Sequence, residues 1–132
     1  MIRLISVLSL ILGVTANVFA VSDLEVVFDG CEPMEVISHD ESCGNGPDPV
    51  NEACRENNGP VRWVPVDSIG SISTKSDFPG GLHNCRAHPN QGYYQCIVRG
   101  NVGDHVSYAV THVSYDVTSP DKCILDPVII IH

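Results

Sequence analysis

VSYAVTHVSYDV, residues 106–117, is the stretch that decides the fold class of this chain. Apolar side chains occupy every second position in two consecutive runs. The runs are Val106, Tyr108 and Val110, followed by Val113, Tyr115 and Val117. A period of two is typical of a β-strand with one buried face. The one-residue slip between the runs, near Thr111-His112, predicts a β-bulge.

The residues that follow complete a hairpin. Ser119-Pro120-Asp121-Lys122 suits a type I turn with proline at its second position. Residues 123–131 are then expected to return as the last strand. We therefore predict a C-terminal β-hairpin as the best-defined element of the chain.

Further strands are expected upstream of this hairpin. They are predicted at residues 24–28, 34–37, 61–66 and 93–98, with a short strand or loop around Ile69 and Ile72 and a turn at Pro79-Gly80-Gly81. Pro65 and Pro127 fall within predicted strands and lack an N–H donor, so we expect these strands at sheet edges or bulges. Prolines at edges would also blunt indiscriminate strand addition.

One short helix is expected near residues 49–57. Asp48 can cap it, Pro49 stands at the first helical position, and Gly59 stands where the helix would end. The fold class predicted from these patterns is mainly β: a small, disulfide-stabilised antiparallel sandwich or sheet with this one helix.

The first twenty residues have the features of a secretory signal peptide. Arg3 precedes the apolar run 4–14, and Val18-Phe19-Ala20 is close to the usual cleavage pattern. The run is too short for a membrane span. We expect a signal peptide at 1–20, a single domain at 21–132, and a secreted, extracellular protein.

The chain has 132 residues and a formal net charge of −9. Without residues 1–20 it keeps sixteen acidic and six basic residues, a net charge of −10. This balance argues against a nucleic-acid binder, which needs cationic side chains for the phosphates. It also argues against docking on anionic membranes.

All six cysteines lie after the signal peptide, and an even count in a small secreted domain predicts three disulfides. No C-x₂₋₄-C pair supports a zinc site. Among the fifteen possible connectivities we favour a nested one, because first and last strands of small β domains often lie side by side and the other pairs close short loops. The predicted bridges are Cys31–Cys123, Cys43–Cys54 and Cys85–Cys96.

Catalytic motifs are absent from the sequence. There is no G-x-S-x-G elbow, no H-E-x-x-H pair and no phosphate loop. We expect no catalytic residues, no cofactor and no metal, and hence a protein that is not an enzyme.

Charge is distributed unevenly along the chain. Residues 21–56 hold ten acidic residues against Arg55 alone. One interpretation is that these acidic residues form a solvated face that aids solubility. The functional one is a docking face for a basic protein partner. Calcium is a third option, without the usual loop motif. The candidate partner-binding residues are Asp23, Glu25, Glu32, Glu35, Asp40 and Glu41.

The layout of signal peptide, short acidic chain, even cysteine count and no catalytic motif resembles the small cysteine-rich effectors that fungi secrete into plant hosts. Cys-Arg-Ala-His-Pro at 85–89 and Cys-Ile-Val-Arg-Gly at 96–100 are similar to secreted-in-xylem types. The resemblance implies a virulence protein without enzymatic activity that binds a host protein or a companion effector.

A second resemblance is to the ML (MD-2-related lipid recognition) family of secreted β-sandwiches. Val27-Phe28-Asp29-Gly30-Cys31 looks like its opening strand and first cysteine, Cys96–Gly100 is similar to its Cys-Pro-Leu-Val-Lys-Gly segment, and Cys123 precedes an apolar last strand. This resemblance implies lipid binding or transfer as the alternative function. The pairing of that family, first with last, second with third and fourth with fifth, agrees with the nested connectivity.

Overall fold

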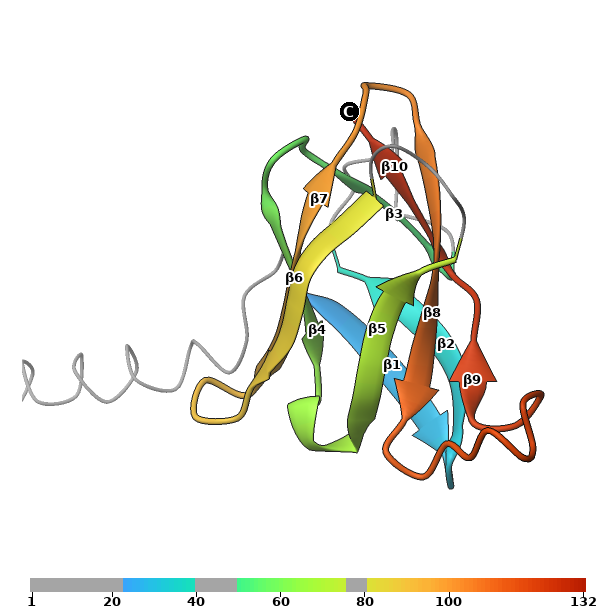
Figure 1. Ribbon diagram of the computed structural model, residues 1–132. Coiled ribbons are helices and arrows are strands. Elements are labelled where there is room, and N and C mark those ends of the chain that lie inside the picture. The colour runs from blue at the N-terminus through green and yellow to red at the C-terminus, as the bar shows by residue number, and fades with distance from the viewer. Residues whose placement is uncertain (1–22, 40–49, 76–80) are drawn as a thin grey trace, which may run out of the picture.

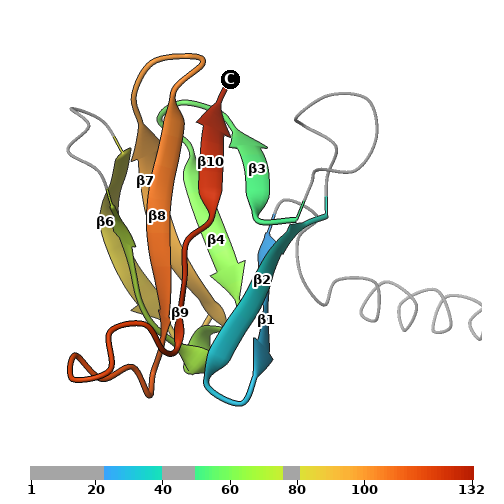
Figure 2. The same cartoon turned by 90° about the vertical axis from the view of Figure 1, so that its right-hand side faces the viewer.

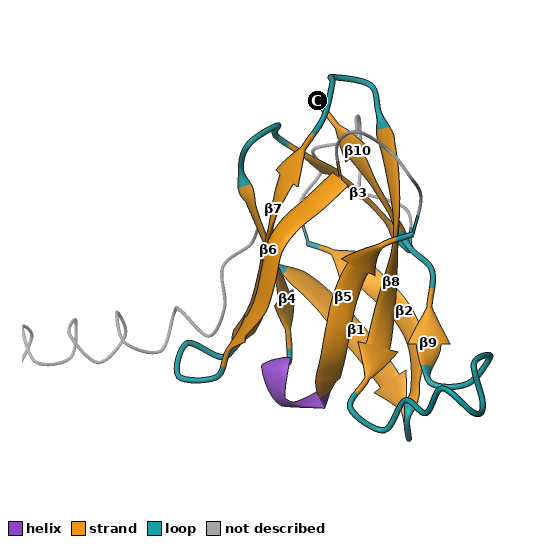
Figure 3. Cartoon of the chain, in the orientation of Figure 1, coloured by secondary structure: helices purple, strands orange, loops and turns teal. Residues whose placement is uncertain are grey.

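The computed structural model describes residues 23–39, 50–75 and 81–132 (Figure 1). Most of these residues lie in strands, and the rest form loops and one 3-10 turn, as Figure 3 shows. The elements are β1 (Leu24–Asp29), β2 (Glu32–Ser38), β3 (Glu52–Arg55), β4 (Pro60–Val64), the 3-10 turn η1 (Val66–Ser68), β5 (Ile69–Thr74), β6 (Gly81–His88), β7 (Tyr93–Arg99), β8 (His105–His112), β9 (Ile124–Leu125) and β10 (Val128–Ile131). The predicted signal peptide lies outside the described residues.

The strands form two sheets. Sheet I has the order β2-β1-β4-β7-β6, and sheet II has the order β3-β10-β8-β5, with β9 also paired to β8. Figure 2 shows β8 and β10 of sheet II in front of β7 and β4 of sheet I. Most neighbours are antiparallel, while β1–β4 and β3–β10 are parallel. The predicted mainly β, disulfide-stabilised sandwich is therefore confirmed.

The core lies between the sheets and follows the period of two. Val61 and Trp63 point inward from β4, and Val106, Tyr108 and Val110 point inward from β8, each with at most 1% exposure. The Trp63 indole Nε1 donates a hydrogen bond of 3.1 Å to Tyr108 Oη. This bond satisfies two polar atoms that burial would otherwise penalise. Burial raises the pKa of Tyr108 far above its ordinary value, so the hydroxyl stays neutral.

Polar contacts join the two sheets along both sides of the sandwich. On one side, Asn51 N donates to Val36 O at 2.8 Å, and Asn51 Oδ1 accepts from Val36 N at 2.7 Å. On the other side, Thr74 Oγ1 accepts from Leu82 N at 2.8 Å. Asn51 thus pairs with the edge of β2 as a strand residue would, and Thr74 does the same for the start of β6.

The prediction of a helix near residues 49–57 is wrong for the residues of this range that the structure describes. Residues 52–55 form β3, paired in parallel with β10. Asn51 has φ 63°, which no right-handed helix contains. The local capping residues favoured a helix, but Ala53, Cys54 and Arg55 are all buried in the sheet. Burial and pairing with β10 override the local signal.

The edge assignment of the two prolines is also wrong. β4 lies between β1 and β7, and β10 lies between β3 and β8, so neither is an edge strand. Pro65 follows the last residue of β4. Pro127 lies in the two-residue interruption between β9 and β10, where its carbonyl accepts from Tyr108 N at 3.1 Å. Both prolines avoid the missing N–H by lying outside the paired segments.

The C-terminal hairpin is confirmed in its inner part and shorter than predicted. β8 pairs with β9 and β10, but it ends at His112, and the second valine-tyrosine run lies in a loop. The bulge is at the predicted place, yet the extra residue is Gly70 in the partner strand β5. Lys122 N donates to Ser119 O at 3.1 Å, which confirms the turn at 119–122.

Two of the predicted disulfides are present, Cys31–Cys123 and Cys85–Cys96. Cys54 is disulfide-bonded as well, and its predicted partner, Cys43, lies outside the described residues. The Cys31–Cys123 bridge spans 92 residues. In the chain-entropy account, closing such a loop stabilises the fold by about 4–5 kcal/mol.

Candidate interaction surface

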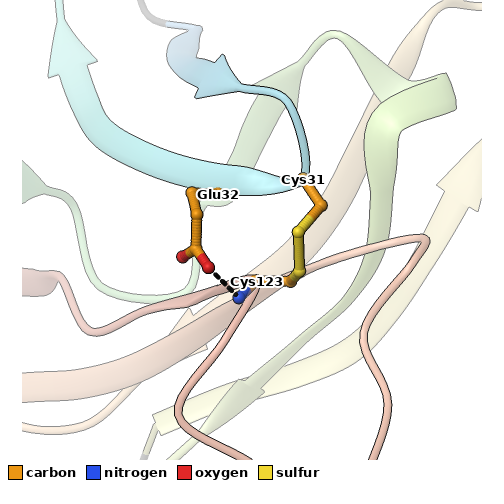
Figure 4. A group of neighbouring side chains, drawn as sticks. All are labelled: Cys31, Glu32 and Cys123. Carbon is orange, nitrogen blue, oxygen red and sulfur yellow. Dashed lines mark hydrogen bonds between the residues drawn. A yellow bond between two sulfur atoms is a disulfide. The ribbon is translucent and has the colours of Figure 1, made fainter. Parts of the chain in front are cut away.

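The structure describes four of the six predicted acidic docking residues, and it does not expose all four on one surface. Asp23 is buried, with 6% exposure. Glu32 Oε1 accepts a hydrogen bond of 3.0 Å from Cys123 N (Figure 4), so this carboxylate holds the segment before β9. Asp40 and Glu41 lie outside the described residues. Of the predicted residues, this leaves Glu25 and Glu35 as acidic side chains on the outer face of a described sheet.

Glu25 and Glu35 define an acidic strip on β1 and β2. Glu25 lies opposite Ile37 in the ladder, and Glu35 lies opposite Val27. The intervening Val26 and Val36 are buried, so alternation places both carboxylates outside. Glu25 Oε1 lies 3.0 Å from His39 Nε2, with side chains 43% and 34% exposed.

The group Cys31, Glu32 and Cys123 brings three possible metal-ligand atoms within 4.8 Å of one another. Figure 4 shows that its two sulfur atoms are bonded together as a disulfide. A cysteine binds metal as a thiolate, which the bridge does not offer. The group therefore fixes the β1–β2 turn to the segment before β9. The described residues contain no free cysteine for a nucleophile.

A cationic strip lies on the same outer face, across β4, β7 and β6. These strands carry Arg62, Arg86 and Arg99, and none of them contains Asp or Glu. Sequence reasoning missed this strip. The signal was available, because no acidic residue occurs between Asp77 and Asp104 in an otherwise strongly acidic chain.

Arg62 is held in place by two neighbours on β7. Its guanidinium carbon lies 4.4 Å from the centroid of the Tyr93 ring, and its Nε donates to Gln95 Oε1 at 2.9 Å. The Tyr93 ring in turn lies 5.2 Å from the ring of His88 on β6. Stacking and hydrogen bonding together fix the guanidinium against the sheet.

Apolar side chains lie between and beside the two strips. Val27, Ile37, Val64 and Ile97 alternate with buried residues on their strands and are half-exposed. Carboxylates, guanidinium groups, a tyrosine and these aliphatic side chains thus share the outer face of sheet I, which we call face I.

No protein-family model matches the chain, and no curated protein matches it either. Among the described residues, no helix has the length and apolar character needed to cross a membrane. Face I therefore has to be interpreted from its own chemistry.

Proposed function

We propose that this protein is a secreted, non-enzymatic binding protein of the effector type, which acts by binding a host protein or a companion effector through face I. The disulfides support a place outside the reducing cytosol, because such bridges persist in oxidising compartments. The signal-like residues 1–20 support secretion. The absence of a catalytic motif in the sequence supports a binding role.

The composition of face I carries this proposal. Protein interfaces combine apolar and aromatic side chains with arginine, surrounded by polar residues. Face I offers half-exposed Val64 and Ile97, the stacked pair Arg62 and Tyr93, and the outlying carboxylate of Glu35. Tyrosine and arginine are also the residue types that dominate binding energy in many interfaces.

The alternative, an ML-type lipid carrier, requires space between the sheets for a lipid. Here Trp63 of sheet I and Tyr108 of sheet II meet at a ring-centroid distance of 5.4 Å, and both are fully buried. The core also includes Leu24 and Val98 from one sheet and Ile129 from the other, each at 0% exposure. Filling by side chains from both sheets favours binding on the outside of the sandwich.

The test compares one substitution on each outer face. Ile97→Lys places a charge on β7 of face I, between Gln95 and Arg99, and Ser73→Lys places the same charge at an exposed position of β5 in sheet II. Partners are captured from host tissue and from the secreting organism with wild-type protein and identified by mass spectrometry. The affinity of each purified partner for the three proteins is then measured.

We expect Ile97→Lys to weaken binding at least thirtyfold and Ser73→Lys to change it less than twofold. Equal affinities of the partner for wild type and both variants would show that the partner does not contact face I. Lipids extracted from the purified wild-type protein provide the second measurement. A stoichiometric sterol or phospholipid would overturn the proposal in favour of the lipid carrier.

A further inference from the structure

The row Arg62–Gln95–Arg86 runs straight across three neighbouring strands of face I. Arg62 lies opposite Gln95 in the β4–β7 ladder, and Gln95 lies opposite Arg86 in the β6–β7 ladder. Opposed residues share a face of the sheet, so the three side chains project to the same side. With strands about 4.8 Å apart, Gln95 separates the two arginines by about 10 Å at the backbone.

Within the described part of the chain, one donor of this row has an acceptor and the others are left over. Arg62 uses Nε for Gln95 Oε1, which leaves its two terminal nitrogens. The same bond orients the Gln95 amide, because its oxygen is the acceptor and its NH₂ group is left to donate. Arg86 is exposed, and neither arginine forms a salt bridge among residues 23–39, 50–75 and 81–132.

The row is also rigid on one side. The Arg62 guanidinium lies over the Tyr93 ring, and the His88 ring packs against Tyr93 from the neighbouring strand. Preorganised donors lose less side-chain entropy when a ligand binds. A fixed Arg62 beside Gln95 and an exposed Arg86, with no acidic residue on their three strands, suit an anion.

We propose that Arg62, Gln95 and Arg86 form a carboxylate site that receives an Asp or Glu side chain of a protein partner. Arginine forks match the planar geometry of a carboxylate through two parallel N–H···O bonds. A sugar ligand is disfavoured because the Arg62 guanidinium already stacks on the Tyr93 ring, which leaves less of that ring for a sugar. This inference rests on the proposed function and gives the partner an acidic anchor at this point.

The experiment needs no identified partner. Triglutamate is titrated into ¹⁵N-labelled protein at 0.15 M salt, where the Debye length of about 8 Å weakens repulsion from the acidic remainder of the chain. Side-chain N–H signals of Arg62, Gln95 and Arg86 are followed by NMR. We expect these signals to shift together and to saturate in the millimolar range, while the Arg99 side chain shifts little.

Matched variants test the assignment. Arg62→Gln and Arg86→Gln should each weaken triglutamate binding about tenfold or more, and Arg99→Gln, which removes the same charge from β7, should change it less than twofold. The backbone spectrum of each variant reports whether the fold is retained, since all three side chains lie on the outside. Gln95→Glu, which adds a negative charge in the row, should abolish binding.

Three results would overturn the carboxylate site. One is a shift that grows without saturation and equally at all arginines, which is general ionic screening. Another is tighter binding of inorganic phosphate than of triglutamate. The third is tighter binding of trigalacturonate, which would assign the row to acidic sugars. None of these affects the Ile97→Lys comparison, so failure of this site and failure of the proposed function are distinguishable.

Discussion

The two outer faces of the sandwich differ, although the inner faces obey the same alternation. On β5 and β8 of sheet II the outward positions hold small residues, among them Ser71, Ser73, Ser107 and Thr111. We call these four residues face II. Face I holds arginines, a tyrosine and half-exposed aliphatic side chains instead. A sandwich tolerates either outer face, since the core depends on the inward residues alone.

Hydrogen bonding separates the two faces further. On face II, Ser71 Oγ and Thr111 Oγ1 lie 2.6 Å apart and bond to each other. On face I, the terminal nitrogens of Arg62 and the Gln95 amide have donors to spare. Under the proposed function, face I serves recognition, and the hydrogen-bonded face II serves stability. Changes on face II should therefore reduce the free energy of unfolding, whereas changes on face I should reduce binding.

The largest effect on stability is expected from Gly70→Ala, at the bulge beside face II. A Cβ at Gly70 would lie 2.7 Å from His112 O and 3.1 Å from Val113 Cα, both backbone atoms. The strands must separate to admit it, so we expect a loss of about 2–3 kcal/mol. Urea unfolding of the oxidised protein measures this loss, with Ser73→Ala as the control. A change below about 0.5 kcal/mol would contradict the assigned strand contact.

A smaller loss is expected from Ser71→Ala, which removes one partner of the hydroxyl pair. One such hydrogen bond contributes about 0.5–1.5 kcal/mol to stability. Partner affinity should stay within twofold of the wild-type value, because the proposed contact surface is face I. Thr111→Val, together with the double variant, completes a double-mutant cycle. A coupling energy near zero would show that the two hydroxyls do not stabilise each other.

The smallest effect is expected from the double variant Glu25→Gln, Glu35→Gln on face I. Half-exposed charges at the rim of an interface mainly change the association rate. We expect association with the captured partner to change two- to threefold at low salt and to match the wild type at high salt. Asp67→Asn with Asp121→Asn removes the same charge from exposed positions elsewhere. Equal effects of both double variants would show that the acidic strip influences association only through the net charge of the protein.

The sequence by itself determined the fold class and the main covalent restraints. A period of two is a backbone property, so Val106, Tyr108 and Val110 could be assigned to one buried face without knowing their neighbours. The Cys31–Cys123 bridge was predicted correctly from the tendency of first and last strands to lie together. In the structure β1 and β10 belong to different sheets, and the bridge joins the β1–β2 turn to the segment before β9. The strand β6 was missed, because its residues His83, Asn84 and Arg86 carry no apolar alternation.

Only the tertiary structure decided which strands are neighbours, and the wrong predictions at residues 52–55 and at the two prolines depended on neighbours. Residues 52–55 became a strand because β10 lies beside them, and the strands next to Pro65 and Pro127 became central for the same reason. Arg62, Arg86 and Gln95 lie up to 33 residues apart along the chain, and they meet only because β4 and β6 flank β7. Local sequence fixes the direction of a side chain from its strand, whereas long-range pairing selects the side chains that surround it.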